Sequence, residues 1–150
     1  MDELAVNRLL DQVLAPWVKQ LGLAAGDVDV CGDVHGGVHG TQATLILPFS
    51  EHFRHAGGVI CGQVFMAAAD TAMVVAISAA LGGFQPMTTV SLNTSFLRAV
   101  RTGDMRITAR VLRLGQNLVF GEVELFDSAG KLAAHATTTY ALLKETPANV

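Results

Sequence analysis

The chain has 150 residues, of which 51% are hydrophobic and 15% are charged, and its formal net charge is −3. This length suits one sizeable hydrophobic core, so we expect a single globular domain over residues 1–150. The mildly acidic balance gives no global attraction to nucleic acid or to an anionic membrane, and we expect neither as a partner.

The N-terminus and the cysteines indicate a reducing compartment. Residues 1–12, MDELAVNRLLDQ, mix charged and apolar residues and lack the basic start of a secretory signal. Cys31 and Cys61 have neither CxxC spacing nor the density of a disulfide framework. We therefore expect a cytoplasmic protein.

The first third of the chain predicts a helix followed by strands. Apolar residues recur at helical spacing from Leu4 to Leu21, which predicts one amphipathic helix, kinked at Pro16 and ending near Gly22. From Val28 to Pro48, apolar and polar residues alternate around several glycines, as in a strand or a bent hairpin with a bulge.

Residues 57–81, GGVICGQVFMAAADTAMVVAISAAL, are almost entirely apolar and carry one carboxylate, Asp70. We expect a helix from near Gly62 to near Gly82. A membrane span is disfavoured, because a carboxylate at a bilayer centre costs several kcal/mol. A helix that is apolar on all sides is instead surrounded by protein.

The rest of the chain alternates with a period of two, which predicts four consecutive strands joined by short turns. Their segments are MTTVSLNTSFLRAV, DMRITARVLRLG, LVFGEVELF and KLAAHATTTYALL. Consecutive strands with tight connections pair antiparallel. The fold class is therefore α+β, with one antiparallel sheet curled around the long apolar helix and an N-terminal helical extension over residues 4–21.

These segments together resemble the hotdog-fold acyl-CoA thioesterases, in particular the branch similar to the phenylacetate-pathway thioesterase. The resemblance covers about residues 45 to 143, and its parts come in the order of the family. It implies a dimer in which two sheets join into one, often paired again into a tetramer, with active sites between subunits. It also implies a catalytic carboxylate at Asp70 and, at Gly62, a backbone N–H that polarises the thioester carbonyl.

The chain departs from the family at two places. Cys61-Gly62-Gln63 stands where many members of this branch have His-Gly-Gly, and Val74 stands where some relatives carry a hydroxyl one turn after the acid. Both departures concern the chemistry of the site and leave the expected fold unchanged.

The spacing of the two implied groups predicts a site shared by two chains. Asp70 follows Gly62 by eight residues, which at about 1.5 Å of rise per residue separates them by about 12 Å along one helix. Reacting groups must approach within about 3 to 3.5 Å. If both groups serve one reaction, the N-terminus of the partner's helix must meet Asp70 across a twofold axis.

The expected reaction is the hydrolysis of an acyl-CoA thioester, without a metal or a separate cofactor. Asp70 acts as nucleophile or as general base, and the sequence does not choose between these roles. Five further residues are expected at the substrate: Cys61 and Gln63 beside Gly62, His55 in the preceding loop, Asn93 either at the acyl pocket or on a solvated strand face, and Arg98 at a coenzyme A phosphate.

Other interpretations stay open at this point. The missing His and hydroxyl favour an acyl-CoA sensor or binding module as the second function. A hotdog dehydratase or hydratase is third, because such enzymes pair a His with the acid and this chain has no His at the expected place. His35 and His39 share strand parity, but no further ligand accompanies them, and a stable metal site needs three or four ligands.

Overall fold

The computed structural model describes residues 1–30 and 40–144. Cys31, His35 and His39 lie outside the described residues, and so does the turn of the hairpin expected between Val28 and Pro48.

The N-terminal extension forms two helices, where the sequence predicted one kinked helix. Helix α1 spans Glu3–Val13, and its N-terminus is capped by Asp2, whose side chain accepts a hydrogen bond of 2.8 Å from the amide of Ala5. Helix α2 spans Pro16–Lys19. Leu14 and Ala15 have ψ of 146° and 147°, and for Ala15 this follows because a residue directly before proline is disfavoured in the helical region. Pro16 therefore ends one helix and begins the next.

Six strands form one antiparallel sheet in the order β1-β2-β4-β5-β6-β3. Their bounds are Ala24–Asp29 for β1, Gln42–Leu47 for β2, Met87–Phe96 for β3, Met105–Leu114 for β4, Leu118–Phe126 for β5 and Leu132–Leu142 for β6. The hairpin of β1 and β2 begins four residues before the expected Val28, and its register shifts between Ala25 and Val28, outside the range in which a bulge was predicted.

The place of β3 differs from the order along the chain. β3 pairs with β6 and not with β4, which follows it directly in sequence. The segment 97–104 therefore leads from one edge of the sheet back to its middle. β3 becomes an edge strand, and its Val90 and Phe96 are 59% and 51% exposed.

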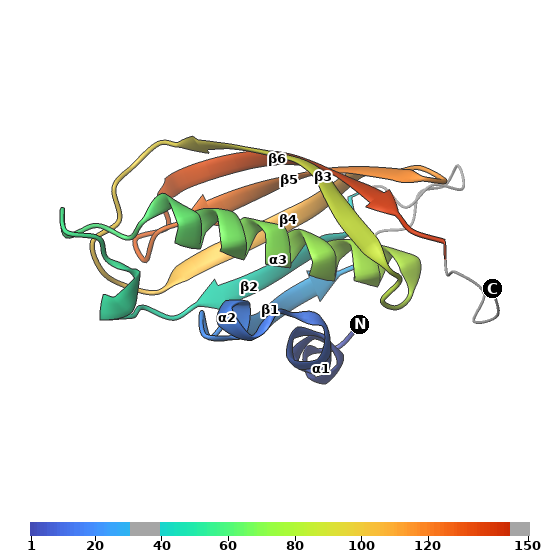
Figure 1. The fold of residues 1–150 in the computed structure, drawn as a ribbon, viewed down its shortest axis with the longest axis horizontal. Coiled ribbons are helices and arrows are strands. Elements are labelled where there is room, and N and C mark those ends of the chain that lie inside the picture. Colours follow the sequence, from blue (N-terminus) through green and yellow to red (C-terminus); the bar gives the residue numbers. More distant parts are fainter. Residues whose placement is uncertain (31–39, 145–150) are drawn as a thin grey trace.

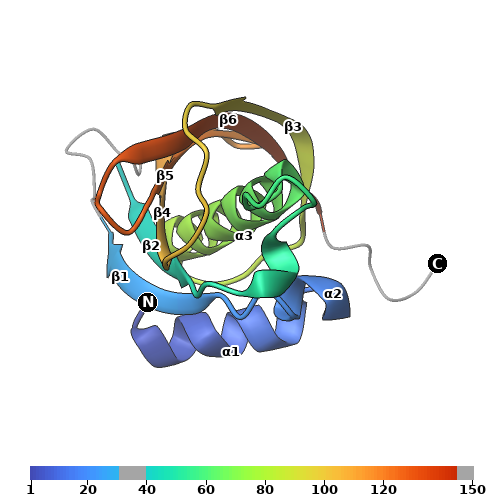
Figure 2. The ribbon, with the colours of Figure 1, turned by 90° about the vertical axis from the view of Figure 1, so that its left-hand side faces the viewer.

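The long apolar helix, α3, spans Gly62–Leu81 as predicted, and Gly82 ends it with a φ of +77° in the left-handed conformation. The sheet curls around α3 (Figures 1 and 2). The alanines of α3 pack against the sheet, and Gly121 of β5 leaves room for the side chain of Met73. α3 is long and apolar enough to cross a membrane, with a mean hydropathy of 2.0, but 67% of it is buried inside the fold.

Candidate functional site

Asp70 lies near the middle of α3 on the face that the sheet leaves half open. Its Oδ1 atom accepts a hydrogen bond of 2.8 Å from the hydroxyl of Thr89 on β3. The same Oδ1 accepts a second hydrogen bond from the hydroxyl of Tyr140 on β6. Three elements far apart in sequence therefore meet at one carboxylate oxygen.

Tyr140 is almost fully buried, with 1% of its surface exposed. Its hydroxyl also lies 2.9 Å from the backbone oxygen of Asp70. Burial, followed by the negative charge of Asp70 and the hydrogen bond to it, raises the pKa of Tyr140 far above its usual range. Tyr140 therefore stays protonated and acts as a hydrogen-bond donor.

The two oxygens of Asp70 are not equivalent. Oδ1 holds both hydroxyl donors, whereas Oδ2 has no hydrogen-bond partner among residues 1–30 and 40–144. A carboxylate anchored through one oxygen has a fixed orientation, and its second oxygen is available to a water molecule or an electrophile.

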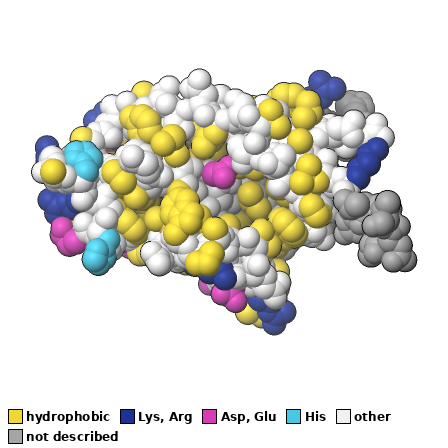
Figure 3. All heavy atoms as spheres, in the orientation of Figure 1, with side chains coloured by type: hydrophobic (Ala, Val, Ile, Leu, Met, Phe, Trp, Pro, Cys, Tyr) yellow, Lys and Arg dark blue, Asp and Glu magenta, His cyan; other side chains and the backbone are white. Residues whose placement is uncertain are grey.

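A hollow of about 320 Å³ opens beside Asp70. Its walls come from the end of α1 and from α2 with the residues between them, from α3, from the first residues of β3 and from Tyr140 of β6. The lining residues are Val13, Leu14, Ala15, Trp17, Val18, Ala67, Asp70, Thr71, Val74, Met87, Thr88, Thr89 and Tyr140. We call this the Asp70 hollow. In Figure 3, hydrophobic side chains surround one acidic group near the centre of the face on which α3 is exposed.

The N-terminus of α3 borders a separate hollow of about 360 Å³, here called the Gly62 hollow. It is lined by Val59, Ile60, Gly62, Phe65, Phe96, Leu97, Arg98 and Ala99. Cys61 provides no side-chain cap to the helix. Within the described chain, the amides of Gly62 and Gln63 have no hydrogen-bond acceptor, so both donors are free for a ligand.

Gly62 also lies close to an aromatic ring. A Cβ atom at this position would come within 3.1 Å of the ring of Phe96, which stacks on Phe65 with ring centroids 6.0 Å apart. Glycine lets the helix start pass close beside this ring.

The other sequence-predicted residues divide between the Gly62 end and the outer surface. Arg98 lines the Gly62 hollow, and Cys61 and Gln63 flank Gly62 at the helix start. The ring Nδ1 of His55 accepts a hydrogen bond of 2.8 Å from the amide of Gly57, which gives His55 a role in the loop. Asn93 is exposed on the face of β3 opposite to the core-packed Leu92 and lines neither hollow.

Tyr140, Thr89 and the bend between α1 and α2 are parts of the site that were not predicted from the sequence. One signal was available for Tyr140: it is the single tyrosine of the chain and occupies a core-facing parity of β6, where a buried hydroxyl needs a partner. No local pattern marks Thr89, because its contact with Asp70 depends on the sheet order. Among the described residues, no three His, Cys, Asp or Glu side chains come together as metal ligands.

An antiparallel sheet wrapped around one long helix, with a carboxylate in that helix, defines the class of hotdog thioesterases. The model of the thioesterase superfamily matches residues 57–134, which include all of α3 and the candidate groups Gly62, Asp70 and Thr89. The chain belongs to this superfamily, which supports hydrolysis of a thioester as its activity.

Individual proteins agree with this assignment. A protein from Thermoplasma volcanium that is named as a candidate esterase is 30% identical over 111 residues, covering 69% of this chain and 77% of its own. The structure of a thioesterase from Haemophilus influenzae superposes with a TM-score of 0.79 at 20% identity and covers 100% of this chain and 96% of its own. The structure of the E. coli PaaI protein, from the phenylacetic acid degradation operon, superposes with a TM-score of 0.77 at 15% identity. It covers 95% of this chain and 94% of its own. The two structures show the fold, and the expected resemblance is confirmed.

Proposed function

We propose that this protein hydrolyses the thioester of an acyl-CoA, with Asp70 as the catalytic carboxylate. The observation that carries the proposal is the anchored carboxylate: Thr89 and Tyr140 hold Oδ1, Oδ2 has no partner among the described residues, and Asp70 lines a hollow in which most of the other lining residues are apolar. Oδ2 then attacks the thioester carbonyl, expels the thiolate of coenzyme A and forms a mixed anhydride that water hydrolyses to the free acid, or it takes a proton from a water molecule that attacks the carbonyl instead.

Val74 stands where some relatives carry a hydroxyl, and two hydroxyls from other parts of the fold lie beside Asp70 instead. Val74 lines the Asp70 hollow as an apolar wall. Thr89 and Tyr140 reach Asp70 from two strands of the sheet and supply the hydroxyl donors there. Their presence supports catalysis by this member despite its departure from the family pattern.

The second half of the proposed site comes from a partner subunit. Gly62 and Asp70 line different hollows and lie about 12 Å apart along α3, which is too far for one reaction. In a twofold dimer formed at β3, the free amides at Gly62 of one chain would stabilise the oxyanion formed beside Asp70 of the other. The exposed Val90 and Phe96 of β3 support such an interface, and a further pairing of dimers would give a tetramer.

Basic residues at the start of α3 support coenzyme A as the leaving group. Arg98 lines the Gly62 hollow, and the guanidinium groups of Arg54 and Arg101 both lie beside Gly58, in the loop that leads into the helix. Basic and His side chains gather at this end of the molecule in Figure 3. Arginine side chains suit the phosphates of a nucleotide.

Thiol release from a panel of aliphatic and aromatic acyl-CoAs tests this proposal. We expect Asp70→Asn to lower kcat/KM at least about 10²-fold, equal to about 2.7 kcal/mol of transition-state stabilisation. Asn has nearly the shape of Asp and still accepts hydrogen bonds through one oxygen, so we expect the variant to keep its fold and its ligand binding. Circular dichroism and binding of an uncleavable coenzyme A thioether check these two points. Equal rates in both proteins would exclude Asp70 as the catalytic group.

The second candidate function is acyl-CoA binding without turnover, which the absence of the family His at Cys61-Gly62-Gln63 favours. Saturable thioether binding with no thiol release from any substrate would establish it. A dehydratase has less support, because no imidazole among the described residues contacts Asp70.

A further inference from the structure

The bend between α1 and α2 forms one wall of the Asp70 hollow. Pro16 keeps Ala15 out of the helical conformation, and Val13 and Trp17 line the hollow from the two helices on either side of the bend. Trp17 is 59% exposed and Val13 37%, so neither side chain is fully used in the core of a single chain. Large apolar side chains left exposed around a hollow indicate a surface that a ligand covers.

Several polar groups of this hollow are occupied within the chain, whereas the hydroxyl of Thr88 and the indole N–H of Trp17 have no hydrogen-bond partner among the described residues. Thr89 and Tyr140 donate to Asp70, and the hydroxyl of Thr71 donates to the backbone oxygen of Ala67 at 2.8 Å. The opposite walls are apolar, with Val74 on α3 and Met87 on β3. Along this apolar wall, a hydroxyl or charged group of a ligand would lose its water without gaining a partner, whereas a hydrocarbon would not.

We propose that the Asp70 hollow holds the acyl group of the substrate, that the part of this group along the apolar wall is a hydrocarbon, and that Trp17 and Val13 determine which acyl groups fit. This inference rests on the proposed thioesterase function, in which Oδ2 meets the thioester carbonyl. The carbonyl then lies at Asp70, its hydrocarbon side extends along α3 to the bend, and coenzyme A leaves toward the Gly62 end of the partner.

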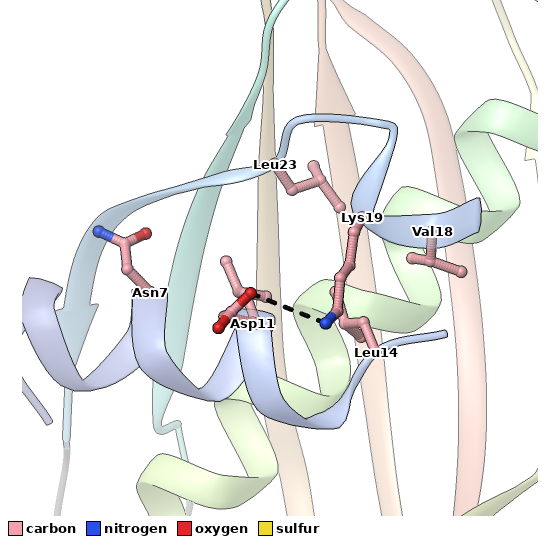
Figure 4. A pocket seen from close by; sticks show the side chains of 7 residues that line it. Asn7, Asp11, Leu14, Val18, Lys19 and Leu23 are labelled. Carbon is pink, nitrogen blue, oxygen red and sulfur yellow. Dashed lines mark ion pairs between the residues drawn. The ribbon is translucent and has the colours of Figure 1, made fainter. Parts of the chain in front are cut away.

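A second hollow on the other side of the bend provides the comparison needed to test this. It has about 180 Å³ and is lined by Asn7, Leu10, Asp11, Leu14, Val18, Lys19 and Leu23 (Figure 4). Its entrance carries an ion pair of 3.7 Å between Lys19 Nζ and Asp11 Oδ1. Leu14 and Val18 line both hollows, whereas Trp17 lines only the Asp70 hollow. A substitution of Trp17 therefore changes the lining of the Asp70 hollow and leaves the lining residues of the second hollow unchanged.

The first experiment measures occupancy without turnover. Trp17 is the only tryptophan of the chain, so its fluorescence reports on this wall alone. Coenzyme A thioethers that bear hexyl or phenylethyl groups are titrated into the wild-type protein, with free coenzyme A as the control. We expect a saturable change with the thioethers and at most a small one with coenzyme A. Thioether binding that is seen by calorimetry but leaves Trp17 unchanged would overturn the inference.

The second experiment measures selectivity. Leu4 of α1 is also 59% exposed and lines neither hollow, so Leu4→Ala is the matched control for Trp17→Ala. We expect Trp17→Ala to lower kcat/KM for the preferred acyl-CoA about tenfold and to shift the preference toward bulkier groups. Leu4→Ala should keep the wild-type profile. An unchanged profile in Trp17→Ala would contradict the inference. If no acyl-CoA is hydrolysed at all, the proposed function fails, and the fluorescence titration still decides whether the hydrocarbon binds at Trp17.

Discussion

The two ends of the candidate site, both carried by α3, differ in how complete they are within one chain. At Asp70, the carboxylate already has its hydroxyl partners, and the hollow beside it has walls from several parts of the fold. At Gly62, the amides point to no acceptor in the described chain, and the nearest large side chain, Phe96, belongs to an exposed edge strand. The hydroxyl partners of Asp70 are thus present within one chain, whereas the amides at Gly62 require an acceptor from another molecule.

The largest expected effect at the amide end comes from Gly62→Pro. Proline suits the first position of a helix and Cys61 is extended with ψ of 151°, so the substitution removes the N–H without breaking α3. If this amide is an oxyanion donor, kcat/KM should fall about 10²- to 10³-fold. Gly62→Ala is the control, because it adds a Cβ at the same distance from Phe96 and keeps the N–H. Equal activity of the two variants would show that this amide is not a donor.

Heterodimers of two inactive variants test whether each site is formed by two chains. Gly62→Pro and Asp70→Asn, unfolded and refolded together in equal amounts, form half their dimers as heterodimers with one intact site each. Activity should return to roughly a quarter of the wild-type value if each site joins two chains. Activity no higher than that of the separate variants would place both groups of a site on one chain and so contradict the shared-site proposal.

At the acid end, Tyr140→Phe should have a smaller effect. It removes one of two donors to Oδ1 and leaves Thr89 in place, so we expect kcat to fall about tenfold with little change in KM. The double variant with Asp70→Asn separates positioning from general damage. If Tyr140 acts only through Asp70, its substitution adds nothing once the carboxylate is gone. Additive losses in the double variant would assign Tyr140 a purely structural role.

The smallest effect appears without any substrate, as a pH dependence of stability. The pKa of Tyr140 is raised in the folded protein above its ordinary value of 10.0. Above that pH the unfolded chain loses the phenol proton and the folded chain keeps it, so the unfolding free energy falls by about 1.4 kcal/mol per pH unit. Below pH 10 this contribution is fully present. Urea denaturation between pH 9 and about 11 should show a steeper decline in the wild type than in Tyr140→Phe, and parallel curves would count against the coupling.

The sequence predicted those parts of the fold that depend on neighbours along the chain. The limits of α3 follow from its continuous apolar run and from Gly82. Asp70 was marked because it is a single charge in an apolar helix. The pairing of β3 with β6 was not predicted, because strand order depends on contacts between distant segments. The positions of Thr89 and Tyr140 beside Asp70 follow from that pairing and were missed with it.

The edge strand β3 also affects how the protein comes to be folded. Its ten residues, MTTVSLNTSF, include no charged side chain, and its outer backbone edge is unpaired within the described residues. Natural proteins usually protect such edges with lysines, prolines or short strands, because an open edge recruits strands from other molecules. A newly made single chain would therefore be prone to aggregation until another chain pairs with the open edge of β3. We expect folding and assembly to compete with aggregation, and thermal stability to rise with protein concentration.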